Sequence, residues 1–392
     1  MMVENQEAPH NMKPSQFERR VLVCVTGLSP QVVTETLYAL ATQAEPWIPT
    51  EVHVLTTSEG ARRAQLLLLE PDRNEFNKLL ADQDLRDVCF GLDHIHVMRD
   101  VKNQPLSDIR TQADNMAVAD GILRAIAQFA ADPDCAIHVS LAGGRKSMGF
   151  FAGYALSLCG RVQDRLSHVL VSEGFESHTQ FFFPPRKPVV LFQQPGNKPL
   201  STADAVIELA DIPFVRLRGN APAALVEEGN FRKVVEAAQR ASGAPSLQIH
   251  AREHVIECAG ERIMLSTLEF AIYAWHATRQ QHEEQPEVVL NQFNAIGSRL
   301  RNELHEFGKR LYHNDFSSDA EEWQKYAWTD DSANHAQWLS ERRSRINKKV
   351  LDALGDEGRD TYGIRSAQLV GKNTAHLLDI PAECIRFVED DS

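Results

Sequence analysis

Residues 20–183 alternate two patterns, short runs of β-branched and other apolar residues and longer segments whose apolar residues recur at helical spacing. Val21–Val25 (VLVCV) is one such run, and its continuity is typical of a strand buried on both faces. After the next turn, Val32, Leu37 and Leu40 recur at helical spacing. This alternation predicts an α/β fold with a doubly wound, mainly parallel sheet and right-handed crossovers.

The same alternation continues to residue 183. We predict strands at Glu51–Leu55, Ile95–Met98, Ala136–Val139 and Leu166–Val171, and helices at Glu59–Leu69, Asp108–Ala130 and Arg145–Cys159. Between residues 181 and 200 the chain becomes rich in Pro and Gly. We expect an irregular connection there, with an added edge strand at Val189–Phe192.

A second domain is expected after this connection. Its predicted elements are helical stretches at Val206–Leu209 and Ala224–Ala241, β-like pieces at Leu247–His250, His254–Glu257 and Arg262–Met264, a helix from Ser266 to Ala277 with Glu269 in a capping box, and a basic helix at Glu341–Leu354 before a hairpin around Gly371–Asn373. Helices followed by a terminal hairpin are typical of a winged helix-turn-helix. We therefore divide the chain into a disordered lead-in (1–17), an α/β domain (18–202) and a C-terminal α+β, winged-helix-like domain (203–392).

The charge balance limits the classes of partner. Acidic residues outnumber basic ones by 54 to 41, which gives a formal net charge of −13. A protein that coats nucleic acid would show a basic excess, although a local pocket for one small polyanion remains compatible with this charge. The longest apolar runs, such as Ala64–Leu69, are far shorter than the ~20 residues of a membrane span. The polar N-terminus does not resemble a signal peptide, so we expect a cytoplasmic protein that does not bind membranes.

The six cysteines are spread along the chain without a CxxC pair. Most of them sit inside apolar runs, a pattern typical of buried, reduced thiols. No cluster of Cys and His has the spacing of zinc ligands. We therefore expect neither a metal ion nor another cofactor.

Two turns that follow predicted strands carry the residues best suited to ligand binding, because ligands of open α/β sheets bind at the carboxyl ends of the strands. The first turn is Thr26–Gln31 (TGLSPQ). Gly27 lets the backbone approach a ligand closely, and Ser29 is placed as a helix N-cap with Pro30 at the first helical position. Amide donors and a hydroxyl would then face an anion at the helix start. A plain helix cap explains the same residues equally well.

The second turn is Ser140–Met148 (SLAGGRKSM). Gly143 and Gly144 expose backbone amides, and Arg145 and Lys146 place positive charge at the opening of the next helix. Such a cationic pair is unfavourable against the helix dipole, which favours an anion beside it. The GxxxxGK[ST] spacing is absent, so an ordinary nucleoside triphosphatase is not supported. The alternative is a solvated loop with a chance Arg-Lys pair.

Three segments in one order carry a specific resemblance. They are TGLSPQVVTETLYAL after the first strand, LAGGRKSMGFFAGYALSLCGRVQDRLSHVLV, and the closing FESHTQFFFPP. Together they resemble a ring-nuclease branch of the CRISPR-associated Rossmann-fold (CARF) family, over about residues 18–215. The resemblance implies a Rossmann-like, homodimeric domain that binds a cyclic oligoadenylate across the dimer axis. The usual ligand is cyclic tetra-adenylate, the second messenger of type III CRISPR complexes.

The resemblance also implies a reaction. RNA carries its own nucleophile, the ribose 2′-hydroxyl, so the ring can be cut without a metal ion if the protein aligns the reacting atoms and stabilises the phosphoryl charge. Cleavage would give linear di-adenylate with a 2′,3′-cyclic phosphate and turn off type III CRISPR signalling. By resemblance the catalytic candidates are Ser29, Lys146 and Arg145. The ligand-binding candidates are Thr26, Gly27, Pro30, Gln31, Ser140, Ala142, Gly143, Gly144, Ser147, Met148 and Glu173.

Two histidines and two glutamates near the predicted strand end have open roles. His168 and His178 have the chemistry of a general acid or base, although a histidine inside a strand is more often structural. Glu173 and Glu176 follow the strand that ends near Val171, where contacts to ribose or adenine are feasible. A solvated loop explains the two glutamates equally well.

The C-terminal domain raises a competing function. Arg342, Arg345 and Lys349 share one helical face, which fits contacts to a DNA backbone. A cyclic-oligoadenylate-responsive transcription regulator is therefore an alternative. A solvated basic face is the plain explanation, since acidic residues outnumber basic ones in this domain too.

A second alternative is a cyclic-oligoadenylate-activated ribonuclease of the HEPN type. Residues 299–305 (RLRNELH) fit the Arg-x₄₋₆-His pattern of those enzymes, whose Arg and His act on the scissile phosphate of RNA. Arg and His also recur by chance in polar helices, so the pattern alone has low specificity.

Overall fold

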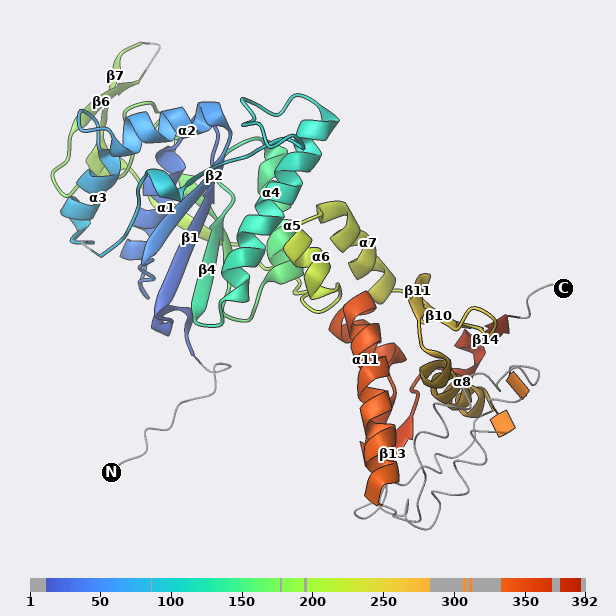
Figure 1. Ribbon diagram of the computed structural model, residues 1–392. Coiled ribbons are helices and arrows are strands. Elements are labelled where there is room, and N and C mark those ends of the chain that lie inside the picture. Colours follow the sequence, from blue (N-terminus) through green and yellow to red (C-terminus); the bar gives the residue numbers. More distant parts are fainter. Residues whose placement is uncertain are drawn as a thin grey trace, which may run out of the picture. The chain divides into compact units, whose positions relative to one another are not determined.

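The computed structural model describes residues 12–85, 87–176, 178–193, 196–282, 306–307, 310–311, 333–368 and 374–388. The chain divides into two units, shown in Figure 1, which are described separately. Unit 1 comprises residues 1–218 and 225–232, and unit 2 comprises residues 219–224 and 233–392. Within the described ranges, no helix has the length and apolar character needed to span a membrane.

Unit 1 is built on a six-stranded sheet of order β3-β2-β1-β4-β5-β8. Its strands are β1 (Arg19–Val25), β2 (Glu51–Thr56), β3 (Ile95–Val97), β4 (Cys135–Ser140), β5 (Arg165–Val171) and β8 (Ile207–Asp211). The first five are parallel, and β8 runs antiparallel to β5 at the edge. The expected α/β fold with a mainly parallel sheet is thereby confirmed. Val21–Val25 is fully buried, as its continuous apolar run predicts.

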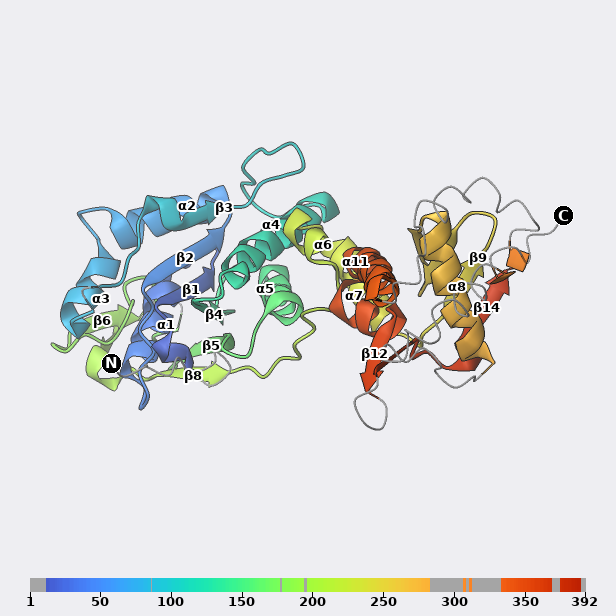
Figure 2. The same cartoon turned by 60° about the horizontal axis from the view of Figure 1, so that its bottom comes forward.

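Helices cover both faces of this sheet. They are α1 (Gln31–Thr42), α2 (Ser58–Ala64) continuing into a π-helical turn (Gln65–Leu69), α3 (Glu75–Gln83), α4 (Gln112–Ala131) and α5 (Lys146–Cys159). Leu22 and Cys24 of β1 pack in one apolar cluster with Val33 and Leu37 of α1, which also contains side chains of α3. The helices α4 and α5 lie side by side on the other face, as Figures 1 and 2 show.

Three expectations for unit 1 were wrong. The segment Val206–Leu209, expected as a helix, runs into the strand β8, which begins at Ile207, and Leu209 pairs with Val169 of β5. A run of four residues is too short for periodicity to distinguish the two structures. The strand near Val189–Phe192 exists as β6 (Val190–Gln193), but it pairs with β7 (Lys198–Ser201) in a separate two-stranded sheet and not with the main sheet. Phe17, placed in the lead-in, is buried.

The division between the units falls within residues 219–232, after the boundary expected at residue 203. The difference arises because β8 completes the sheet of unit 1. The division between the two units passes through the helices α6 (Ala223–Glu228) and α7 (Phe231–Ala241).

Unit 2 combines a four-stranded sheet, of order β11-β10-β9-β14, with two long helices and a hairpin. Its elements are β9 (Leu247–His250), β10 (Val255–Cys258), β11 (Glu261–Met264), α8 (Thr267–Gln281), α11 (Ala333–Tyr362, interrupted at Gly355), β12 (Arg365–Gln368), β13 (Thr374–Leu377) and β14 (Ile385–Val388). The capping box expected at the start of α8 is confirmed, because Ser266 accepts from the Glu269 amide and Glu269 accepts from the Ser266 amide. The strand β14 runs parallel to β9.

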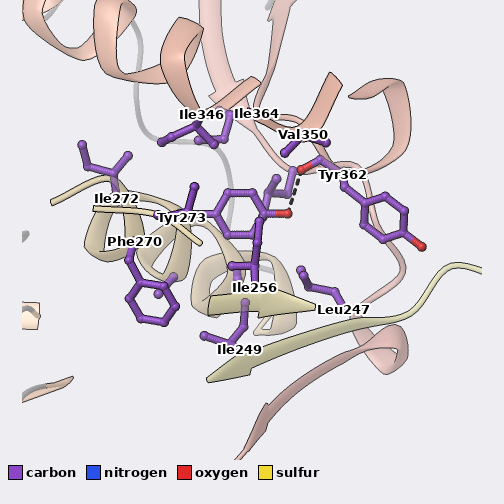
Figure 3. Packing of buried hydrophobic residues seen from close by; sticks show 14 of the residues in the cluster. Leu247, Ile249, Ile256, Phe270, Ile272, Tyr273, Ile346, Val350, Tyr362 and Ile364 are labelled. Atoms are coloured by element: carbon purple, nitrogen blue, oxygen red, sulfur yellow. Dashed lines mark hydrogen bonds between the residues drawn. The ribbon is translucent and has the colours of Figure 1, made fainter. Parts of the chain in front are cut away.

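The core of unit 2 surrounds α8. Ten consecutive residues of this helix, Leu268–Ala277, are buried, as expected for a helix covered on all sides. Figure 3 shows Tyr273 at the centre of the cluster, with Ile256 of the sheet and Ile346 of α11 around it. The Tyr273 hydroxyl donates to the main-chain oxygen of Tyr362 at 2.7 Å, which satisfies this buried polar group.

Candidate functional site

The two glycine turns meet where the strand order of the sheet reverses. After β1 the chain goes to β2 on one side, and after β4 it goes to β5 on the other. The crevice between two such strands, at their carboxyl ends, is the usual ligand site of doubly wound sheets. The turns expected to bind ligand, Thr26–Gln31 and Ser140–Met148, begin at these two strand ends.

The contact between the turns requires glycine. A Cβ atom on Gly27 would lie 3.2 Å from the Cα of Gly144. A Cβ on Gly143 would lie 2.7 Å from the carbonyl oxygen of Val25, too close for any side chain to fit without backbone movement. Gly144 has φ +80°, a conformation that side chains rarely adopt. The glycines therefore let two backbones approach each other beneath a ligand site.

A pocket of about 320 Å³ opens at this junction. It is lined by residues of both turns, the first part of α1, the end of β5 and the loop after it: Gly27, Leu28, Ser29, Gln31, Val32, Glu35, Ala142, Gly143, Gly144, His168, Val169, Leu170, Val171 and Glu176. The structure thus brings Ser29 and Gln31 of the first turn together with Ala142, Gly143 and Gly144 of the second.

The start of α1 differs by one residue from the expectation. Ser29 was expected as the N-cap with Pro30 at the first helical position, whereas the helix begins at Gln31 and Pro30 occupies the N-cap position. No side chain caps this helix. The Ser29 hydroxyl is exposed and not used as a cap, so it faces the pocket mouth as a donor or acceptor for a ligand.

Glu35 is the site residue that sequence reasoning missed. It lies one helical turn after Gln31 on α1, so both side chains point to the pocket. Glu35 is 5% exposed, and its burial, with a smaller contribution from the Glu176 carboxylate, raises the pKa of Glu35 to about 8. Gln31 Oε1 is buried without a hydrogen-bond partner among the described residues. The sequence signal was the i, i+4 pair of polar residues directly after the turn.

The cationic residues stand beside the pocket. Arg145 and Lys146 are exposed at the opening of α5. Arg145 forms two hydrogen bonds to Asp108, Nε–Oδ1 at 3.1 Å and Nη2–Oδ2 at 2.5 Å, and this pairing lowers the pKa of Asp108. The described lining of the pocket includes Glu35 and Glu176 but no Lys or Arg. The lining therefore suits an uncharged nucleoside better than a phosphate.

The amino-terminal end of α5 is suited to binding an anion such as a phosphate group. The first amides of a helix have no intrahelical acceptor and carry partial positive charge. In this chain they directly follow Gly143 and Gly144, at the edge of the pocket. An anion at this position would contact amides and Lys146 at once.

Four predicted ligand-binding residues have side chains that serve the fold instead. Thr26, Pro30, Ser140 and Met148 are buried. The Ser140 hydroxyl lies 3.0 Å from the hydroxyl of Thr36, inside unit 1. These side chains are not exposed to a ligand, because they complete the packing beneath the turns. Two further candidates, Ser147 and Glu173, do not belong to the described lining of the pocket.

The two histidines considered as a general acid or base lie in different places. His168 on β5 lines the pocket and is half-buried. His178 lies in the following loop, where its Nε2 is 3.2 Å from the carbonyl oxygen of Phe192. Of the two, His168 is placed to exchange a proton with a ligand.

The basic face expected on α11 is only partly exposed. Arg342 is 4% exposed, because it shares the buried face of α11 with Ile346 and Val350. Lys349 Nζ lies 2.7 Å from Glu269 Oε2, so its charge is paired inside unit 2. Arg345 is exposed. The burial of Arg342 and the ion pair of Lys349 do not favour DNA contacts by these two side chains, and DNA contacts by the three residues stay a prediction.

The HEPN-type pattern, Arg299 and His305, lies outside the described residues. The assignment of this pattern to a ribonuclease stays a prediction.

A doubly wound sheet with a pocket at its switch point is typical of α/β domains that bind ligands. The family model of CRISPR-associated protein NE0113 matches residues 29–244, from Ser29 inside the first turn, through the second turn and past β8. This match spans more than half of the 392 residues, so the chain belongs to this CRISPR-associated family. Among curated proteins, none matches the chain.

Two solved structures show weak similarity. One is Enterococcus italicus Csm6 bound to cyclic hexa-2′-fluoro-hexa-dAMP, with 9% identity, 86% of this chain and 68% of that chain covered, and a TM-score of 0.29. The other is protein VC1899 from Vibrio cholerae, with 10% identity, coverages of 91% and 75%, and a TM-score of 0.24. Both TM-scores are too low to show that the folds are the same.

Proposed function

We propose that this protein is a ring nuclease that binds cyclic tetra-adenylate at the two glycine turns and cleaves it without a metal ion. The observation that carries the proposal is the pocket where both turns meet at the switch point, next to the opening of α5. Membership of a CRISPR-associated family and the resemblance of both turns to ring nucleases support it. Cleavage would switch off type III CRISPR signalling.

The pocket and its edge would bind different parts of one nucleotide. Adenine or ribose would enter the pocket, where the Gln31 amide can both donate and accept and the protonated Glu35 carboxyl can donate. The adjoining phosphate would lie at the α5 amides, near Lys146. Arg145 would reach the phosphate only after leaving Asp108, so its role would be binding and not catalysis.

The reaction would be a transesterification within the ring. The ribose 2′-oxygen attacks the adjacent phosphorus, the bond from phosphorus to the 5′-oxygen breaks, and a 2′,3′-cyclic phosphate and a 5′-hydroxyl result. The 2′-hydroxyl loses a proton and the 5′-oxygen gains one, and His168, which lines the pocket, would carry it. Lys146 would stabilise the phosphoryl charge, and Ser29 would hold a phosphate oxygen. Two such cuts give two linear di-adenylates.

A homodimer would place two such pockets around one ring, and that arrangement is part of the proposal. Exposed apolar side chains flank both turns, with Leu28 59% and Phe150 64% exposed. Large apolar side chains exposed beside a binding site are typical of an interface.

Cleavage of radiolabelled cyclic tetra-adenylate in EDTA by single-site variants tests the site. Lys146→Ala should slow single-turnover cleavage by roughly 10²-fold, as loss of one charge-stabilising donor does. Ser29→Ala should slow it by roughly 10-fold. The exposed Lys102 of the same unit provides the matched control, and Lys102→Ala should cleave at the unaltered rate. Cleavage that Lys146→Ala leaves unchanged would defeat the assigned site.

A second candidate is a DNA-binding regulator for which the ring is only an effector. A groove of about 600 Å³ in unit 2 favours it, since Arg343 of α11, Arg359 and Arg365 of β12 line it next to the hairpin β12–β13. A helix followed by a hairpin also fits the winged-helix-like domain that we propose there. Fluorescence anisotropy with a duplex DNA should then show affinity that changes with cyclic tetra-adenylate and falls in Arg343→Ala. Equal anisotropy with and without the ring would argue against this function.

A further inference from the structure

Three histidines and a glutamate gather in unit 1 away from the glycine turns. Glu51 and His53 are neighbours on one face of β2, His94 lies in the 3₁₀ turn Leu92–His94, and His96 is on β3. His53 Nε2 is 3.1 Å from Glu51 Oε2, and His53 Nδ1 is 2.8 Å from His96 Nε2. The rings of His53 and His94 have centroids 4.7 Å apart. Nothing in the proposed function uses these side chains.

The cluster lies at the opposite end of the sheet from the pocket. The strands β1 and β2 are parallel, and Glu51 pairs with Val21 while Leu55 pairs with Val25, just before the first turn. Glu51 and His53 are therefore near the amino end of β2, whereas ligand binding is expected at the carboxyl ends. A role for the cluster must be separate from the ring site.

We propose that Glu51, His53 and His94 bind one Zn²⁺ ion. Their ligand atoms all lie within 4.8 Å of one another. Bonds of about 2.1 Å in a tetrahedral zinc site place ligand atoms about 3.4 Å apart. Glu51 Oε2 and His53 Nε2 are 3.1 Å apart. A small movement of the His94 ring would complete three ligands, and water would take the fourth position. Two imidazoles and one carboxylate are the protein ligands of known zinc sites that keep a water in the fourth position.

Neighbouring groups already orient each ligand. Arg19 Nε donates to Glu51 Oε1 at 2.5 Å, which leaves Oε2 for the metal. The Gly91 amide donates to His94 Nδ1 at 3.1 Å, so the neutral ring carries its proton on Nε2, and this hydrogen bond must be released for Nε2 to bind the ion. His96 contacts Nδ1 of His53, the nitrogen that would not bind the ion. Such outer contacts, which fix the ring and the tautomer, accompany most metal-binding histidines in proteins.

His53 is the most buried of the three proposed ligands, at 7% exposed. Without a metal, Nε2–H of His53 can donate to Glu51 Oε2. When zinc binds Nε2, the single ring proton would move to Nδ1, from which it can be donated to His96 Nε2.

The expectation of no metal site was based on the spacing of Cys and His residues along the sequence. The fold brings together residues that are far apart in the sequence. The helices α2 and α3, the π-helical turn and a loop separate His94 from His53 along the chain, and the parallel pairing of β2 with β3 brings the two together. Zinc would tie the short edge strand β3 to the sheet, because His94 directly precedes that strand. The proposed ion is therefore structural.

Zinc titration of the full-length protein after EDTA treatment and dialysis tests the proposal. Isothermal titration calorimetry with zinc chloride should give one ion per chain, and His94→Gln should weaken the affinity at least tenfold. The exposed His282 of unit 2 is the matched control, and His282→Gln should bind as the unaltered protein does. His94 is chosen over the buried His53 because its replacement leaves the core intact.

Two further measurements complete the test. Cobalt(II) should give the intense visible absorption of a tetrahedral site in the unaltered protein, reduced at least tenfold in His94→Gln. Zinc should raise the melting temperature of the unaltered protein by several degrees and that of His94→Gln by less. Stoichiometric zinc binding that His94→Gln leaves unchanged would overturn the proposal, as would the absence of stoichiometric binding. Neither result depends on whether the protein cleaves cyclic tetra-adenylate.

Discussion

Burial has a larger effect on the pKa of Glu35 than any nearby charged group has. The side chain is 5% exposed and its strongest charged neighbour is another carboxylate, Glu176. Both effects disfavour ionisation, and together they keep this carboxyl protonated at neutral pH. A protonated carboxyl can donate a hydrogen bond to a nucleotide without repelling its phosphates.

Glu35 should make stability depend on pH. The unfolded chain ionises Glu35 near pH 4.5, whereas the folded protein holds the proton until about pH 8. The unfolded state binds fewer protons between these values, so the free energy of unfolding falls as pH rises from about 5 to 8. The loss should be on the order of a few kcal/mol. Urea unfolding of the unaltered protein and of Glu35→Gln at about pH 5.5 and about pH 8 measures it, and the variant should show the smaller difference.

Glu35 should also couple ring binding to pH. Above about pH 8 the ionised carboxylate would repel the phosphates and lose its donor, so the affinity for cyclic tetra-adenylate should fall. Glu35→Gln keeps a neutral donor of similar size, and its affinity should change less over the same range. Calorimetric titrations at about pH 6.5 and about pH 9 measure the effect. Equal pH dependence in both proteins would exclude Glu35 from the contact.

At the scale of the elements, the two glycine turns act as one unit. Gly143→Ala would place its Cβ against the carbonyl oxygen of Val25 at 2.7 Å, so one of the two turns must move. Affinity for cyclic tetra-adenylate should fall at least tenfold, and overpacking should cost about 1–3 kcal/mol of stability. Gly153→Ala in α5 is the matched control, because its Cβ would meet no atom closer than 3.5 Å. Calorimetry and thermal melting of both variants distinguish a local from a general effect.

The core of unit 2 offers a prediction that is independent of the ring. Tyr273→Phe removes the hydrogen bond to the main-chain oxygen of Tyr362, which lies 2.7 Å away in a buried environment. The variant should lose about 1–3 kcal/mol of stability, the cost of leaving a buried acceptor unsatisfied. Urea unfolding followed by far-ultraviolet circular dichroism measures the loss. A variant as stable as the unaltered protein would mean that water reaches the Tyr362 oxygen.

The sequence allowed the sheet and both turns to be predicted because each depends on local patterns. VLVCV has the composition of a fully buried strand, and glycines after strands mark close backbone approaches. Other features depend on tertiary pairing that no short segment encodes. Val206–Leu209 became a strand because β5 was available to pair with it. The burial of Arg342, and the meeting of His94 with His53, likewise depend on how distant elements pack.

For the whole molecule, the net charge of −13 and the acidic pocket lining disfavour a surface that binds polyanions in general. The proposed selectivity for one small ring then depends on a few amides and Lys146, with two copies of the chain around the ligand. Size-exclusion chromatography with light scattering should show a dimer of about twice 44.0 kDa. Leu28→Asp should shift the protein toward the monomer, because a charge would be buried in the interface. A monomer at all protein concentrations would exclude the proposed homodimer.

The most direct test of the central claim is the fate of cyclic tetra-adenylate mixed with the purified protein in excess EDTA. Mass spectrometry of the products distinguishes a 2′,3′-cyclic phosphate end from other ends. We expect the unaltered protein to form linear di-adenylate with that end, and Lys146→Ala to form it much more slowly. An intact ring after prolonged incubation, or cleavage only on addition of a divalent metal ion, would contradict it.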